Sequence, residues 1–306
     1  MASSSEQLIL DIEDMKVKGA YLITRVSLEA LALRAQELVA KAEPTLPALR
    51  VASERLKVAQ PSMASVANAC DYVLRSLPED DSAQLVRQLA ERGQEFLAAF
   101  DRAQEQVVEV GARCVRAGDV IFIHSYTGTL LGVFRRAREQ GKQFSVIATE
   151  SRPYCEGRVM VAELLKLGIP CTIVTDASIG SLIGRANKSM VGSDSILSNG
   201  SVVNKMGTYL LALACQAARV PLYAAGSVFK LSIASVQGDE VTMLQRLDDG
   251  AIAPKDVPSD APLRVENTIF DITPAHLVEA LITDHGLLPP AAIASFRDHP
   301  MLRPAA

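Results

Sequence analysis

The sequence predicts an α/β protein in which a helical N-terminal domain precedes a Rossmann-like domain with a mostly parallel sheet. Two observations support this prediction. From about residue 8 to 117, apolar side chains recur at helical spacing in an Ala-rich and Glu-rich background. After Gly118, short β-branched runs alternate with helical stretches of about 10–15 residues, which is typical of right-handed βαβ units. We therefore expect two domains, at residues 1–117 and 118–306.

The first half contains helical segments separated by prolines. Leu31 and Leu38 belong to the apolar series, and Pro44 and Pro61 interrupt it. A long helix is expected over 82–117, and no convincing strand is present in this half.

The second half alternates strands and helices. Strands are expected at 120–123, 144–148, 171–174, 190–194 and 222–225, and helices at 130–141, 157–167, 178–187 and 203–218. Residues 235–264 form an irregular excursion rich in Asp, Pro and Gly. A further helix is expected to begin at Thr273 and Pro274 and to stop at Gly286. No Gly-x-Gly-x-x-Gly motif follows a strand, so a dinucleotide is not the expected ligand.

Composition narrows the class of protein. Of the 306 residues, 49% are hydrophobic and 22% are charged, which is typical of a globular protein. The net charge of −4, without a basic block, argues against nucleic acid as a partner. The five cysteines are scattered and odd in number, which favours a reducing cytoplasm. We expect neither a secretory signal nor a membrane span, since the longest apolar run, at 209–218, is too short.

Polar residues follow the predicted strands, where parallel sheets bind their ligands. They are His124-Ser125, Glu150 to Arg152, Asp176, Asp194 and Gly226-Ser227. This set suits a small, polyhydroxylated, anionic ligand. Asp194 stands out, because it ends an apolar strand and precedes an Asn199-Gly200 turn. Asn204 and Lys205 are expected to open the next helix. Together with Asp194 they predict a site that binds a phosphorylated polar molecule and moves its protons.

Motifs along nearly the whole chain resemble one known family. They are Met15 to Ala20, Gln60 to Met63 with Asn68-Ala69, Glu150 to Pro153 with Gly157-Arg158, Gly192 to Asp194 with Asn199-Gly200, Asn204 to Thr208, and Asn267 to Gly286. The family unites the initiation factor 2B regulatory subunits with ribose-1,5-bisphosphate isomerase and 5-methylthioribose-1-phosphate isomerase. The resemblance implies the same two-domain fold and a homodimer or higher homo-oligomer.

The resemblance also implies an activity, namely conversion of an aldose 1-phosphate into a ketose 1-phosphate without a metal or organic cofactor. Asp194 falls on the family's aspartate and would be the general acid or base. Groups from both halves would bind the small phosphorylated sugar: Gly19, Ala20, Arg25, Arg152, Asn204, Lys205 and Lys230.

The chain departs from the family pattern at three positions. In the loop after the first strand, Ser125 stands where the isomerases have a catalytic cysteine, and serine is a far poorer proton donor than a thiol. Lys18 and Gln60 stand where arginine is common, and lysine lacks the bidentate fork of arginine. Cys155 follows a neighbouring strand and offers a thiol from another direction, although an inert loop cysteine is the simpler interpretation.

Each candidate also has a purely structural interpretation. Asp194 and Asp176 can cap a turn or a helix, Lys230 can be a surface lysine, and His124 fits a hydrogen-bonded strand end better than a base. Lys205 in a first helical turn would be poorly placed as a cation without a ligand.

Three functions follow from these observations. The first is a cytoplasmic isomerase of a ribose-1,5-bisphosphate-like sugar, with Asp194 and Ser125 at the reacting carbons. The second is a non-catalytic regulatory protein that binds a sugar phosphate or nucleotide. The third is a different reaction on the same scaffold.

Overall fold

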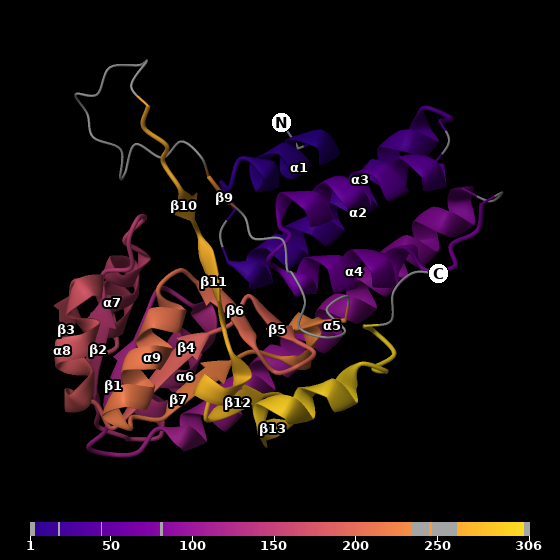
Figure 1. Cartoon of the computed structure of the whole chain (residues 1–306). Coiled ribbons are helices and arrows are strands. Elements are labelled where there is room, and N and C mark those ends of the chain that lie inside the picture. Colours follow the sequence, from indigo (N-terminus) through magenta and orange to yellow (C-terminus); the bar gives the residue numbers. More distant parts are fainter. Residues whose placement is uncertain are drawn as a thin grey trace.

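The computed structural model describes residues 4–17, 19–43, 45–79, 82–233, 245–246 and 262–302. Helices alone build the chain up to residue 114 (Figure 1). They are α1 Ser5–Glu13, α2 Ala20–Ala40, α3 Thr45–Ala59, α4 Ala64–Leu74 and α5 Ser82–Cys114. Among the described residues no strand precedes Val120, as the sequence predicts. The long helix ends three residues earlier than expected, at Cys114.

The helix ends follow local chemistry. The Ser4 hydroxyl accepts a hydrogen bond from the Gln7 N–H at 3.2 Å and caps α1. Helix α3 stops at Ala59, two residues before Pro61, because proline cannot continue a helix. The helices bury their apolar sides in one cluster, in which Phe96 and Phe100 of α5 are fully buried.

The main sheet has the order β13-β12-β7-β4-β1-β2-β3. Its strands are β1 Val120–Ile123, β2 Ser145–Thr149, β3 Cys171–Val174, β4 Lys188–Gly192, β7 Leu222–Ala225, β12 Ala280–Thr283 and β13 Gly286–Leu288. All neighbouring pairs are parallel except β12 with β13. The five predicted strands are therefore confirmed, within two residues at each end, and the mostly parallel Rossmann-like order is confirmed with them.

Helices cover both faces of this sheet. Helix α5 packs on α6 Gly128–Glu139, and α6 packs on α7 Glu156–Lys166. On the other face, α9 Thr208–Ala218 contacts the short α8 Ile179–Leu182. The predicted helix over 178–187 is in fact three short pieces, namely η1 Asp176–Ser178, α8, and η2 Ile183–Arg185.

A second sheet corrects the prediction of one helix over 203–218. Its order is β11-β6-β5-β8, with β5 Ser195–Leu197, β6 Val202–Lys205, β8 Leu231–Ser232 and β11 Phe270–Thr273. Val202 and Val203 are β-branched and pair with strands on both sides, so this segment is a strand. Helix α9 begins only after Gly207, which has a φ of 103°. Asn204 and Lys205 thus lie on β6 and not at a helix start.

The predicted helix from Thr273 to Gly286 is also wrong. Thr273 is the last residue of β11, and Pro274 precedes the short η4 Ala275–Leu277. The chain then forms the β12–β13 hairpin, in which Gly286 has a φ of 104°. Pairing with β7 overrides the local helix signals here.

The irregular excursion predicted at 235–264 lies outside the described residues, apart from two short pieces. These are β9 Gln245–Arg246, which pairs with β10 Asn267–Thr268, and residues 262–264.

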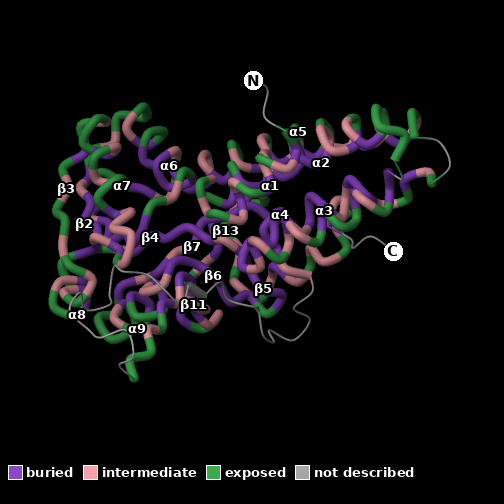
Figure 2. Tube along the Cα trace, turned by 90° about the horizontal axis from the view of Figure 1, so that it is seen from above, coloured by how far each residue is buried: buried purple, intermediate pink, exposed green. Residues whose placement is uncertain are grey.

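The side chains of Ser195 and Asn68 make hydrogen bonds between the helical part and the α/β part. The Ser195 hydroxyl donates to the Ser62 carbonyl at 2.8 Å and accepts from the Ala64 N–H at 2.7 Å. The Asn68 amide donates to the carbonyls of Phe229 and Leu231, each at 2.9 Å. One apolar cluster extends through both parts, and a second packs α5, α6 and α7 against the main sheet. Figure 2 shows buried residues along the trace of both parts. The division into two domains at residue 117 stays a prediction.

Asp271 of β11 holds the start of α9. Its carboxylate accepts hydrogen bonds from the N–H groups of Gly207 at 2.7 Å and Tyr209 at 3.1 Å. Burial raises the pKa of Asp271 to about 6, against the opposing effect of these backbone donors. The α9 start therefore depends on a carboxyl group that titrates near neutral pH.

This titration predicts a pH-dependent stability. The folded protein holds the Asp271 proton more tightly than the unfolded chain, so its stabilisation is complete below pH 3.8 and is lost as pH rises through 6. Relative to Asp271→Asn, which cannot ionise, the wild type should lose about 1 kcal/mol of unfolding free energy between pH 5 and 7. Urea unfolding of both proteins at the two pH values measures this. A difference that does not change with pH would contradict it.

Candidate functional site

The strand order identifies the place where a ligand should bind. Strand β1 lies between β2, which follows it in the chain, and β4, so the order reverses between β1 and β4. In sheets of this kind ligands bind outside the carboxyl ends of the strands at that point. The loop after β1 carries Ser125, and the loop after β4 carries Asp194. The loops touch, because a Cβ added to Gly192 would lie 2.8 Å from the Thr127 hydroxyl oxygen.

Asp194 is half-buried in the turn that links the two sheets. Its N–H donates to the Val203 carbonyl at 2.8 Å. Within the described part of the chain its carboxylate has no hydrogen bond and no ion pair within 4.0 Å. Burial raises the pKa of Asp194, the charges of Lys230 and Lys205 lower it, and that of Glu156 raises it further. The carboxylate thus lies within the field of two lysines without a direct contact to either.

Lys230 approaches Asp194 from the short turn η3 Val228–Lys230. The side chain is buried, and Nζ donates to the Ser193 carbonyl at 2.5 Å. Burial lowers the pKa of Lys230, and the Asp194 charge opposes that shift. Gly226 leaves the room for this arrangement, because a Cβ there would lie 2.1 Å from the Ser193 hydroxyl oxygen. Lys230 is therefore not a surface lysine.

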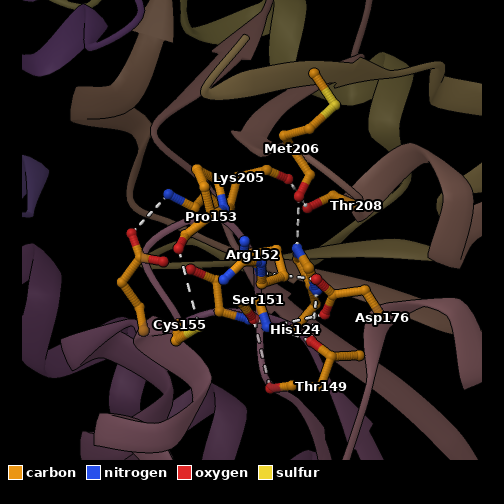
Figure 3. Close-up of polar contacts among 12 residues, drawn as sticks. His124, Thr149, Ser151, Arg152, Pro153, Cys155, Asp176, Lys205, Met206 and Thr208 are labelled. Carbon is orange, nitrogen blue, oxygen red and sulfur yellow. Dashed lines mark hydrogen bonds and ion pairs between the residues drawn. The ribbon is translucent and has the colours of Figure 1, made fainter. Parts of the chain in front are cut away.

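Lys205 reaches the site from β6, as Figure 3 shows. Its side chain is 6% exposed, and Nζ lies 2.6 Å from Oε1 of Glu156, the first residue of α7. The same ammonium group lies 4.7 Å from the centre of the Tyr154 ring, within cation–π range. A nearby buried amide, that of Asn204, donates to the Thr208 hydroxyl at 2.9 Å.

Ser125 and His124 follow β1. Ser125 has a φ of 67°, in the left-handed region, and its N–H donates to the Ser151 hydroxyl at 2.7 Å. The His124 Nε2 lies 2.7 Å from the Met206 carbonyl and must donate to it, so Nδ1 accepts from Thr149 at 2.6 Å. Burial lowers the pKa of His124, which keeps the ring neutral. His124 is the hydrogen-bonded strand-end residue that the sequence predicts.

Asp176 organises the loop after β2. Its two carboxylate oxygens accept from the N–H groups of Ser151 at 2.8 Å and Arg152 at 2.6 Å (Figure 3). Asp176 thus uses its carboxylate on the β2 loop and not as the helix cap of its structural interpretation. The loop continues through the cis Arg152–Pro153 bond to Cys155, which is half-buried and has a φ of 57°. Arg152 thus lies at the carboxyl edge, with its backbone held from β3.

The candidates from the helical part lie around the start of α2. Gly19 has a φ of 86° and precedes the buried Ala20, the first residue of the helix. Thr24, one turn on, lies 2.8 Å from the hydroxyl of Ser65 on α4, the helix that also holds Ser195. Arg25 instead pairs with Asp101 of α5 at 2.9 Å on the exposed side. Lys18 lies outside the described residues.

The structure therefore brings Asp194, Lys205 and Lys230 together and leaves Arg25 in an ion pair of its own. Sequence reasoning missed Glu156 as a member of this group. The sequence carries no signal for the contact, because only the folded β6 brings Lys205 to Glu156. The next residue, Gly157, fixes the start of α7 against β2, since a Cβ there would lie 1.8 Å from the Thr149 carbonyl oxygen. A hollow of about 560 Å³ lies elsewhere, on α3, lined by residues that include Arg50, Val51 and Val58.

The fold places this protein in a class in which a helical part precedes a Rossmann-like sheet, with the charged residues at the carboxyl edge of that sheet. By its sequence the chain belongs to the Initiation factor 2 subunit family, whose model matches residues 16–290. It is 34% identical to ribose 1,5-bisphosphate isomerase of Archaeoglobus fulgidus over 91% of this chain and 88% of that protein. It is 35% identical to the putative translation initiation factor eIF-2B subunit 2-like protein of Pyrococcus abyssi, over 93% and 96%.

A solved structure has the same fold. The crystal structure of the Pyrococcus horikoshii translation initiation factor eIF-2B matches with a TM-score of 0.81 and 31% identity, over 95% of this chain and 99% of that one. The resemblance inferred from the motifs is thereby confirmed. Within the described residues, no helix is both long and apolar enough to cross a membrane.

Because of its two hydrogen bonds to the loop after β2, we expect Asp176 to stabilise the folded protein at the edge of the site. Asp176→Ala leaves two backbone N–H groups without their carboxylate acceptor and should lower the free energy of unfolding by about 1–2 kcal/mol. Asp176→Asn, which keeps one acceptor oxygen, should lose less. Urea denaturation compares the three proteins, and an alanine variant as stable as the wild type would show that the contacts contribute nothing.

Proposed function

We propose that this chain is an aldose–ketose isomerase that acts on a pentose-type aldose 1-phosphate similar to ribose 1,5-bisphosphate. The observation that carries the proposal is the half-buried Asp194 carboxylate, which lies near two buried lysines and has no hydrogen bond or ion pair among the described residues. A raised pKa suits a group that must both give and accept a proton. The names of the isomerase relatives support the same reaction class.

The reaction requires two proton movements and one hydrogen shift. The ring oxygen takes a proton as its bond to C1 breaks, and the hydrogen on C2 moves with its electron pair to C1. The C2 hydroxyl loses its proton and becomes the carbonyl, so C2 is oxidised and C1 is reduced. Asp194 would supply or accept one of the protons, and Ser125 would hold a sugar hydroxyl from the β1 loop.

The charges of the site favour one orientation of the sugar. Lys205 is neutralised by Glu156, and Lys230 donates to Ser193, so the polyol would lie against this part. The phosphate would then meet N–H groups at the start of α2, Gly19 and Ala20, which a helix N-terminus offers to anions. Arg152 would approach from the sheet edge, whereas Arg25 stays paired with Asp101, and Asn204 would hold a hydroxyl after releasing Thr208.

A second candidate function is a regulatory protein that binds a sugar phosphate or nucleotide without turning it over. Ser125 favours it, because the β1 loop then lacks an acidic proton. The relatives named as eIF-2B subunit 2-like proteins agree with it. Binding without conversion would make this the leading function. A cytoplasmic location stays a prediction under both proposals.

The isomerase proposal predicts the effect of Asp194→Asn. The amide keeps the shape of the side chain and removes its proton transfer, so kcat should fall about 100-fold or more while substrate binding persists. Phosphorus NMR with ribose 1,5-bisphosphate follows ketose formation. Asp119→Asn is the matched control, because Asp119 pairs with Lys188 at 2.8 Å at the opposite ends of the strands. Turnover by the Asp194 variant at the wild-type rate would end the assignment.

A homodimer or higher homo-oligomer is also proposed. Tyr209, Leu210 and Leu213 are 40%, 53% and 42% exposed on α9 and form an apolar stripe suited to a second copy of the chain. Replacing Leu210 and Leu213 together by Glu should produce monomers, measured by light scattering after gel filtration. Leu165→Glu on α7, where Leu165 is 56% exposed, is the control and should leave the assembly intact. A monomeric wild type would contradict the proposal.

A further inference from the structure

Glu156 has one carboxylate oxygen that the described residues do not use. Its Oε1 accepts from Lys205 at 2.6 Å, whereas its Oε2 is buried and has no hydrogen-bond partner in that part of the chain. A buried carboxylate oxygen without a partner carries a desolvation cost, and such groups are rare in folded proteins. The cost is explained if a ligand hydroxyl supplies the missing hydrogen bond.

Glu156 and Asp194 both interact with Lys205. Both carboxylates act on one ammonium group, that of Lys205, which pairs with Glu156 and lowers the pKa of Asp194. The charged and titratable groups around Asp194 are Lys205 from β6, Lys230 from η3 and Glu156 from α7, and the buried His124 lies within the field of Lys205 and Glu156. Two carboxylates therefore share the electrostatic environment of Lys205 at this edge of the sheet.

The proposed isomerisation needs two proton-transfer groups, one at the ring oxygen and one at the C2 hydroxyl. Ser125, with an aliphatic hydroxyl, is a poor donor for either step. We propose that Glu156 is the second acid–base group of the site and works opposite Asp194. One carboxyl group gives its proton to the ring oxygen, the other takes the proton of the C2 hydroxyl, and the hydrogen on C2 shifts to C1, so no other reactant is needed. This inference rests on the proposed isomerase function and names a further residue in it.

Two other roles are distinguishable from this one. Glu156 can act only by positioning Lys205, in which case an amide at this position would keep the contact and the activity. Cys155, the neighbouring residue, can instead provide the proton, although its Sγ is directed to the Pro153 carbonyl at 3.9 Å. The variants Glu156→Gln and Cys155→Ala separate these roles.

The test measures kcat and KM with ribose 1,5-bisphosphate for the wild type and four variants. Glu156→Gln should lose about 100-fold or more in kcat with KM within about threefold, and one limb of its kcat–pH profile should disappear. Glu156→Asp, which keeps a carboxyl group, should recover part of the activity. Cys155→Ala should stay near the wild type. Glu163→Gln is the matched control, since Glu163 lies on the same helix and pairs with Lys166 at 2.7 Å.

A second measurement uses ribitol 1,5-bisphosphate, a polyol that cannot isomerise, as the probe. Calorimetry should show that it binds the Glu156→Gln variant within a few-fold of the wild type, which establishes that this variant is folded. An active Glu156→Gln variant overturns the inference alone. A wild type that binds the probe but converts no aldose 1-phosphate overturns the proposed function and this inference together.

Discussion

Two buried lysines near one carboxylate are the electrostatic constraint around which the carboxyl edge of the sheet is built. Lys205 and Lys230 are each about 5% exposed, and a buried ammonium group is costly unless acceptors and negative charge surround it. The Ser193 carbonyl and Glu156 supply direct acceptors at 2.5 and 2.6 Å. Asp194 provides charge without a direct hydrogen bond to a described residue. Asp194 thus adds negative charge near both lysines, while its own carboxylate oxygens have no hydrogen bond among the described residues.

The fold maintains this balance by joining its two parts next to Asp194. Ser195 is hydrogen-bonded to the start of α4. Asn68 of α4 also donates a hydrogen bond to the η3 turn, which carries Lys230. Helix α5, which packs in the helical bundle and against the sheet, ties the same parts together over its 33 residues. These contacts join the helical part to the segments that carry Asp194 and Lys230.

Much of this arrangement could be predicted from the sequence, and the failures have physical causes. The strands of the parallel core are short apolar runs between glycines, so 120–123 and 171–174 were correct to the residue. The local sequence predicts a helix at Val203, whereas pairing with β5 and with β11, which lies far away in the chain, makes it a strand. The sequence predicts Asp194 and Lys230 as site residues from their positions and a family resemblance, and their roles stay a prediction. It does not indicate Glu156, because only the folded β6 brings Lys205 to it.

The proposed chemistry requires that Asp194 carries an available carboxyl group and not one held in an ion pair. Titration of this carboxyl by carbon-13 NMR tests the requirement, with its resonance assigned by its loss in Asp194→Asn. We expect a pKa above the ordinary value of 3.8, because burial outweighs the two lysines. A pKa below 3.8 would mean that a lysine holds the carboxylate as a salt bridge, and the proposed role of Asp194 would then be wrong.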